Sequence, residues 1–70
     1  MVNNIRVERA RIRMTQNELA EALGVSQTSI VNWEQDLSGC SAGKLVEMSN
    51  IFGVSLDYLY GLTDVRGRLK

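Results

Sequence analysis

Residues 16–35 of this chain of 70 residues predict two short helices joined by a tight turn. Leu19, Ala20 and Leu23 follow the i, i+1, i+4 spacing of one helical face, and this apolar stripe indicates a first helix over residues 16–23. Gly24 comes directly after the stripe, and glycine enters a left-handed turn without a steric cost at Cβ. The pattern therefore predicts a helix that ends at residue 23 and a chain that turns sharply there.

A second helix is expected over residues 27–35, directly after the turn. Ser26 has a residue type preferred at a helix N-cap, and Ile30 and Trp33 form an apolar stripe. An alternative role for Trp33 is stacking on a base, but its spacing from Ile30 favours packing in the core. Two helices joined in this way form a helix-turn-helix motif, whose second helix fits the major groove of DNA.

Three further helices are expected, and the sequence shows no strand pattern and no internal repeat. Thr15 and Glu18 have the spacing of a capping box, and Gly53 and Ser55 mark the end of one helix and the start of the next. The chain is therefore expected to be an all-α, compact five-helix domain over residues 1–63, followed by a basic flexible tail over residues 64–70. The expected helices cover residues 4–13, 16–23, 27–35, 41–52 and 56–60, and residues 35–40 form a loop.

Composition excludes several classes of protein. Cys40 is the only cysteine and histidine is absent, so neither an internal disulfide nor a metal site is expected. The polar start of the sequence and the lack of a long apolar run predict neither a signal peptide nor a membrane span. We therefore expect a cytoplasmic bacterial protein with no cofactor, no membrane partner and no small-molecule ligand.

The formal net charge of the chain is zero. This value argues against nucleic-acid binding, because the neutralisation of phosphates normally needs a basic surplus. Any affinity for DNA must then depend on helix dipoles, backbone amides and a few well-placed cations, and we expect it to be modest for a monomer.

The second helix of the motif carries an uncharged polar face opposite its apolar stripe, as a rotation of 100° per residue shows. Glutamine and asparagine amides pair with adenine N6 and N7, and valine and threonine methyl groups contact the thymine methyl. The alternative is that these side chains are ordinary solvated residues, but their place after the turn favours base reading at a site rich in A·T pairs. The expected base readers are Gln27, Thr28, Val31 and Asn32.

Gln16 is the main candidate for a phosphate contact. It lies at the start of the first helix of the motif, where free amides and the positive end of the helix dipole favour an anion. Its side chain is also placed to contact Gln27 and hold it in position. Weaker phosphate candidates, by position alone, are Ser29, Ser38 and Lys44.

Arg9 and Glu34 are expected to form a structural ion pair between two helices. Glu34 lies beside Ile30 on the helical wheel, away from the DNA-facing side, and Arg9 precedes the inward-facing Ile12 by about one turn. The alternative for Arg9 is a phosphate contact. Arg6 is expected to lie outside the packed face of its helix.

Four blocks of the sequence resemble the Cro and phage-repressor (XRE-type) helix-turn-helix family, over residues 5–64. They are Thr15-Gln16-x-x-Leu19-Ala20, Leu23-Gly24-Val25-Ser26, Ile30-x-x-Trp33-Glu34 and Gly53-Val54-Ser55-x-Asp57-Tyr58-Leu59, in the family's order and spacing. The resemblance implies a compact five-helix, lambda-repressor-like domain that binds operator DNA, usually as a dimer on two half-sites. It also implies a phosphate contact for Gln16, an interhelical salt bridge for Arg9 and Glu34, and base contacts for Gln27, Thr28 and Asn32.

The loop after Glu34 departs from the family pattern. It carries Asp36, and Cys40 stands at the place of a frequent proline, which lowers the affinity for DNA expected from this loop. Members of the family often have a second domain for dimerisation, whereas this sequence ends at Lys70. Self-association is therefore expected through the last helix, residues 56–60, and the tail. The expected dimer contact is an apolar patch of Val54, Leu56 and Tyr58, and the alternative places Leu56 and Leu59 in the core.

These features favour a sequence-specific DNA-binding transcriptional regulator, a repressor that acts by covering its operator. Two recognition helices of a homodimer are expected to enter successive major grooves about 34 Å apart. The alternative is a protein-interaction module, such as an antitoxin or antirepressor partner, but the polar residues at positions 27, 28 and 32 argue against it. An enzyme is not expected, because there is no histidine, no base beside the cysteine and no catalytic pair of carboxylates.

Overall fold

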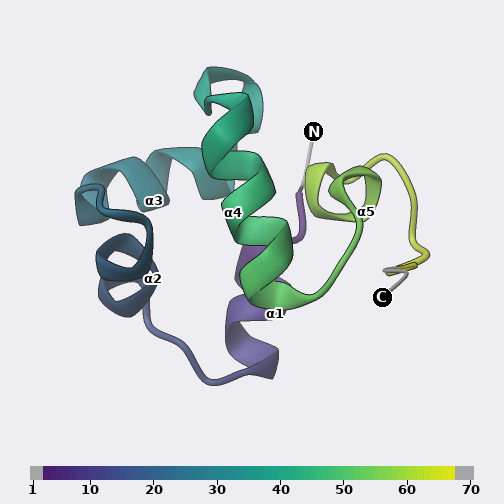
Figure 1. The fold of residues 1–70 in the computed structure, drawn as a ribbon, viewed down its shortest axis with the longest axis horizontal. Coiled ribbons are helices and arrows are strands. Elements are labelled where there is room, and N and C mark those ends of the chain that lie inside the picture. The colour runs from purple at the N-terminus through teal and green to yellow at the C-terminus, as the bar shows by residue number, and fades with distance from the viewer. Residues whose placement is uncertain (1–2, 68–70) are drawn as a thin grey trace.

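The computed structural model describes residues 3–67, and this part of the chain is all-helical. The helices are α1 (Ile5–Arg11), α2 (Gln16–Leu23), α3 (Gln27–Gln35), the 3₁₀ helix η1 (Leu37–Gly39), α4 (Ala42–Phe52) and α5 (Leu56–Tyr60). Figure 1 shows α2 and α3 on one side of α4, and α5 on the other side. The predicted all-α class with five α-helices is thus confirmed.

Capping contacts fix the ends of the two motif helices where the sequence predicts them. The Thr15 hydroxyl accepts from the backbone N–H of Glu18 at 3.0 Å, and the Glu18 carboxylate accepts from the backbone N–H of Thr15 at 2.8 Å. Gly24 ends α2 with a φ of 70°, a left-handed backbone conformation that residues other than glycine rarely adopt. Ser26 then caps α3 by accepting from the backbone N–H of Ser29. These contacts hold α2, the turn and α3 as a helix-turn-helix.

α1 is shorter than predicted, because it ends at Arg11 and not at residue 13. Ile12 is its C-cap, and Arg13 adopts a left-handed φ of 57°, which cannot continue a right-handed helix. Ile5 is fully buried and Ile12 packs against the core, so the predicted inward face of this helix is right. Arg6 and Arg13 are exposed, as predicted.

The hydrophobic core collects side chains from every helix. Leu37 belongs to it with 3% exposure, although the sequence places this residue in a polar loop. η1 makes this possible, because its single turn directs Leu37 inwards while Asp36 caps it by accepting from the backbone N–H of Ser38. Trp33 packs against the core, as its spacing from Ile30 predicts. The buried apolar residues are Ile5, Leu19, Ala20, Leu23, Ile30, Leu37, Met48, Phe52, Val54, Tyr58 and Leu59.

The predicted dimer patch is wrong for two of its three residues. Val54 is fully buried and Tyr58 is 7% exposed, so both pack in the core, whereas Leu56 remains 45% exposed. The alternative is right for Leu59, which is fully buried, and wrong for Leu56. The cause is the left-handed turn at Gly53, which directs the residue after it back against the core and turns one face of the five-residue α5 inwards.

Glu8 is a buried carboxylate that the sequence analysis does not single out, and its side chain is 1% exposed. The Tyr58 hydroxyl donates to it at 3.0 Å, the Arg11 Nε donates to it at 2.5 Å, and the Arg66 Nε lies 3.2 Å away. Burial alone would raise the pKa of Glu8. The hydrogen bonds from Arg11 and Tyr58, together with the charges of both arginines, outweigh burial and hold this pKa below its ordinary value.

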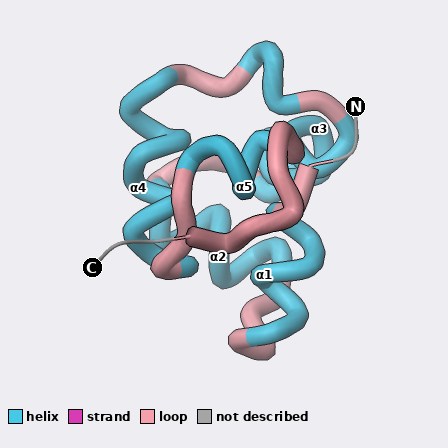
Figure 2. The backbone as a smooth tube through the Cα atoms, turned by 90° about the vertical axis from the view of Figure 1, so that its right-hand side faces the viewer, coloured by secondary structure: helices cyan, strands magenta, loops and turns pink. Residues whose placement is uncertain are grey.

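The segment after α5 is attached to the domain through Arg66. Its carbonyl accepts from the backbone N–H of Ser55 at 3.0 Å, and its guanidinium pairs with Glu8. Figure 2, which faces α5, shows the loop after this helix folding back across it. Of the predicted flexible tail, residues 68–70 lie outside the described part of the chain.

Candidate nucleic-acid interface

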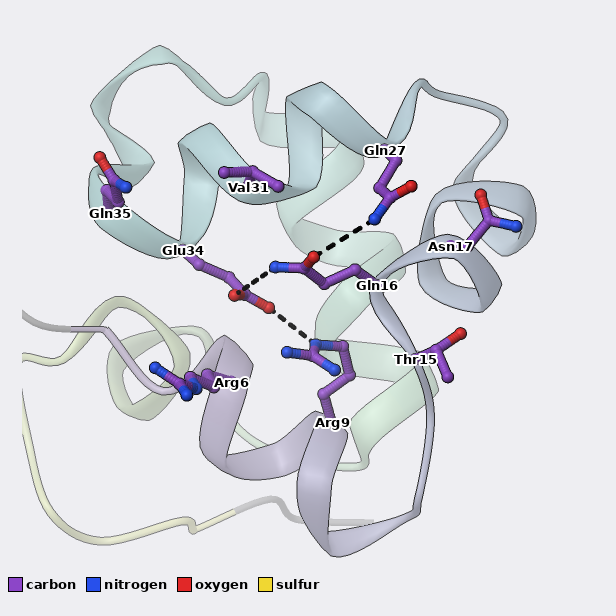
Figure 3. Close-up of a pocket in the computed structure, with 9 residues that line it drawn as sticks. All are labelled: Arg6, Arg9, Thr15, Gln16, Asn17, Gln27, Val31, Glu34 and Gln35. Carbon is purple, nitrogen blue, oxygen red and sulfur yellow. Dashed lines mark hydrogen bonds and ion pairs between the residues drawn. The ribbon is translucent and has the colours of Figure 1, made fainter.

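A surface groove of about 650 Å³ runs between α3 and the two preceding helices. The exposed side of α3 forms one wall, while α1 and the start of α2 form the other (Figure 3). Eight of its nine lining residues are polar or charged. The lining residues are Arg6, Arg9, Thr15, Gln16, Asn17, Gln27, Val31, Glu34 and Gln35.

The structure exposes all four predicted base readers, but it brings only two of them into the groove. Gln27 and Val31 line its α3 wall, and Val31 is the only aliphatic side chain there. Thr28 and Asn32 are exposed on the same helix without lining the groove. The predicted face of α3 is therefore open to a ligand along its length, with Gln27 and Val31 nearest to the other helices.

A chain of hydrogen bonds crosses the middle of the groove. Arg9 Nε donates to Glu34 Oε2 at 2.7 Å, and the side chains of this ion pair are 15% and 10% exposed. Gln16 Nε2 donates to the other carboxylate oxygen, Glu34 Oε1, at 3.0 Å. Gln27 Nε2 in turn donates to Gln16 Oε1 at 3.4 Å. The expected ion pair and the expected contact between Gln16 and Gln27 are thus both present, and Glu34 connects them (Figure 3).

The connection between Glu34 and Gln16 was missed in the sequence analysis. Glu34 was placed away from the DNA-facing side, whereas it lines the groove itself. Its position on the helical wheel, beside Gln27 and one turn after Ile30, was the available signal. The long glutamate side chain reaches back from the edge of the inward face to the groove.

The N-terminus of α2 forms one end of the groove. Gln16 is the first residue of this helix, and Thr15 and Asn17 line the groove beside it. The first amides of a helix have no acceptor within the helix, and the helix dipole adds positive potential there. With one N–H of Gln16 donated to Glu34, its second N–H has no partner in the described part of the chain. This end of the groove thus offers several donors to an anion.

Arg6 is a groove residue that the sequence analysis did not select. It is exposed and pairs with no acidic side chain among residues 3–67, while the charge of Arg9 is balanced by Glu34. Arg6 therefore supplies the remaining positive charge of the groove, at its α1 wall (Figure 3). Its spacing of three residues from Arg9 places both arginines on one helical face, and this was the signal available in the sequence.

The three weaker phosphate candidates do not line the groove. Lys44 Nζ donates to the carbonyl of Leu23 at 2.6 Å and lies 3.6 Å from Glu47, so its charge faces the C-terminal end of α2. The hydroxyl of Ser29 forms a hydrogen bond of 3.1 Å with that of Ser26. Ser38 is exposed in η1.

Other kinds of site find little support in the described residues. Within residues 3–67, no three side chains of histidine, cysteine, aspartate or glutamate are grouped so that they can hold a metal ion. Among the described residues, no helix combines the length and the apolar character that crossing a membrane requires.

The sequence model of the helix-turn-helix family matches residues 5–59. Two curated proteins of Bacillus subtilis (strain 168) are also similar. The HTH-type transcriptional regulator ImmR is 35% identical over 57 residues, which are 81% of this chain and 45% of ImmR. The uncharacterized HTH-type transcriptional regulator YobD is 35% identical over 52 residues, which are 74% of this chain and 46% of YobD. The chain thus spans less than half the length of either relative.

Proposed function

Since the chain belongs to the helix-turn-helix family, we propose that it binds double-stranded DNA in a sequence-specific manner through α3 and the groove beside it, and regulates transcription without catalysing a reaction. The observation that carries the proposal is the chain of hydrogen bonds from Arg9 to Gln27. It holds a polar side chain of α3 in one orientation at the surface of the molecule. A side chain ordered in this way is suited to reading a base edge.

In the proposed complex, the exposed face of α3 lies in the major groove. Gln27 and Asn32 pair with adenine, while Val31 and the methyl group of Thr28 contact thymine methyl groups. All four side chains are exposed, and none of them is charged. The proposed operator is therefore rich in A·T pairs at the positions that α3 contacts.

The backbone of one DNA strand borders the major groove and is proposed to run along the groove of the protein. Gln16 and the first amides of α2 bind one phosphate, and Arg6 binds another on the same strand. Ser29 and Ser38 are proposed to make further contacts with the DNA backbone. Lys44 is proposed to act mainly from a distance, because its ammonium group already contacts Leu23 and Glu47.

We propose repression by occlusion as the mode of action. A homodimer on two half-sites would cover DNA that the polymerase needs, in the bacterial cytoplasm. The names of the relatives ImmR and YobD support regulation of transcription. The polar lining of the groove fits DNA better than a protein partner, for which aromatic or aliphatic anchors are typical.

The test is selection from a randomised pool of DNA duplexes, with sequencing of the bound fraction and fluorescence anisotropy on the enriched sequence. We expect a palindrome whose half-sites are centred about 10 base pairs apart, and an affinity that falls as salt rises. Binding without any enriched sequence at about 50 mM salt contradicts specific recognition, and a pull-down for protein partners then becomes the next experiment.

A further inference from the structure

The donors of the hydrogen bonds that cross the groove all point towards Glu34, and this carboxylate sets their direction. A carboxylate can only accept, so the atom of Gln16 that faces it must be the donor Nε2. Gln16 therefore turns its oxygen to the other side. The atom of Gln27 that faces this oxygen must again be its Nε2. The orientation of the Gln27 amide thus follows from a carboxylate that Gln27 does not touch (Figure 3).

This orientation determines which groups Gln27 can offer to a base. One of its two N–H groups is donated to Gln16, so one N–H donor and the Oε1 acceptor remain. In the major groove, adenine presents an acceptor at N7 and a donor at N6, whereas guanine presents two acceptors, N7 and O6. One donor together with one acceptor is the pattern complementary to adenine.

We propose that Glu34 is a positioning residue that sets the base preference of Gln27 to adenine, acting through Gln16. The inference rests on the function proposed above. Arg9 takes part because its Nε holds the second oxygen of Glu34 at 2.7 Å. With 10% of its side chain exposed, Glu34 has little room to turn away from Gln16.

The substitution Glu34→Gln reverses the chain of hydrogen bonds. The new amide keeps its oxygen for Arg9 and turns its NH₂ group towards Gln16, which must flip to accept with Oε1. The Nε2 of Gln16 then faces Gln27, whose Oε1 accepts in turn. Both N–H groups of Gln27 become free, and two donors match the N7 and O6 acceptors of guanine.

The test is competitive binding to the operator selected by the wild-type protein. Each A·T pair of a half-site is replaced in turn by G·C, and the affinity ratio for the two duplexes is measured by fluorescence anisotropy. We expect the wild type to favour adenine at one position by about tenfold or more, and Glu34→Gln to favour guanine at that position. Because both duplexes compete for the same protein, partial unfolding of the variant cancels in the ratio.

Two variants serve as controls. Glu21→Gln makes the same chemical change at an exposed residue of α2 that does not line the groove, so the adenine preference should not change. Gln16→Met breaks the chain of hydrogen bonds between Glu34 and Gln27 and leaves the ion pair of Arg9 and Glu34 intact. The affinities for the adenine and guanine duplexes should therefore become nearly equal. This second variant decides the question if Glu34→Gln does not fold.

The outcomes separate this inference from the proposed function. A wild type that selects no sequence overturns both. A wild type that selects an operator but shows no adenine preference dependent on Gln16 overturns the inference alone. An undiminished adenine preference in Glu34→Gln also overturns the inference alone. A shift to guanine that also requires Gln16 supports the inference.

Discussion

The buried carboxylate of Glu8 gives a sharp test of the packing between α1 and α5. The substitution Tyr58→Phe removes the hydroxyl that donates to Glu8 at 3.0 Å and leaves the buried ring in place. A hydrogen bond to a charged group contributes about 1.5–3 kcal/mol to the free energy of unfolding. The lower half of this range applies, because Arg11 and Arg66 still contact Glu8 in the variant.

A loss of this size is a large part of the stability of such a small domain. At about 0.05–0.15 kcal/mol per residue, 70 residues give a free energy of unfolding of about 3.5–10.5 kcal/mol. A destabilisation of about 1.5–2 kcal/mol should lower Tm by about 6–16 °C. Thermal unfolding followed by circular dichroism measures this change, and urea unfolding gives the free energy itself.

The matched control is Tyr60→Phe. Tyr60 also packs against the core, but its hydroxyl has no hydrogen-bond partner among residues 3–67. Its removal should change the free energy of unfolding by less than about 0.5 kcal/mol. Equal effects of the two substitutions would refute the reasoning, because they would show that the bond to Glu8 contributes nothing specific.

The effect of Tyr58→Phe should also depend on pH in a defined way. The pKa of Glu8 is lower in the folded state than in the unfolded chain, so its stabilising effect is present above about pH 4.3 and is lost as the pH falls through the folded-state pKa. Burial and the hydrogen bond to Glu8 raise the pKa of Tyr58, so the stabilising effect of its hydroxyl is lost as the pH rises through that raised value, above about pH 10. The difference in stability between wild type and variant should therefore shrink at both extremes.

Three further predictions concern the groove. Arg6→Gln should reduce the magnitude of the slope of log K for DNA against log salt by about 0.9. Arg13→Gln removes an exposed arginine outside the groove and should change this slope little. Equal slopes for the two variants would contradict a phosphate contact by Arg6. Gln27→Ala should reduce discrimination at one base position by about 1–3 kcal/mol in competition assays, and a loss of helical signal in this variant would show that the reading face is wrongly assigned. Arg9→Ala should lower the free energy of unfolding by about 2–4 kcal/mol in urea titrations, because the mostly buried carboxylate of Glu34 loses its ion pair. A cost below about 0.5 kcal/mol would show that the pair is dispensable.

Local signals in the sequence predicted most helix boundaries. Ser26, Gly53 and Ser55 act within one turn of their own position, so their residue type is enough to place a helix end. The end of α1 carries no such signal. Its C-cap is Ile12, and an arginine adopts the left-handed conformation that follows, so the sequence pattern extended this helix by two residues.

Several contacts between distant parts of the chain were not predicted from the sequence. In the sequence, Glu8 is indistinguishable from an ordinary exposed charged residue. Its partner Tyr58 lies 50 residues away and contacts it only in the folded domain. Leu37 is a single apolar residue in a polar loop, and only the packed fold shows that it is buried. Within the candidate site, the pairs that the sequence predicted, Arg9 with Glu34 and Gln16 with Gln27, are present in the structure. Their union into one chain of hydrogen bonds depends on side-chain directions that the helical wheel does not give.

The position of Glu8 and its partners along the chain has a consequence for folding during synthesis. Glu8 leaves the ribosome early, but Tyr58 and Arg66, which stabilise its negative charge, are added to the chain 50 and 58 residues later. Before they emerge, burial of this carboxylate lacks two of its three partners, and the early helices gain little from packing together. We therefore expect the nascent protein to stay open and protease-sensitive until residue 66 has cleared the exit tunnel, and then to fold in a single cooperative step.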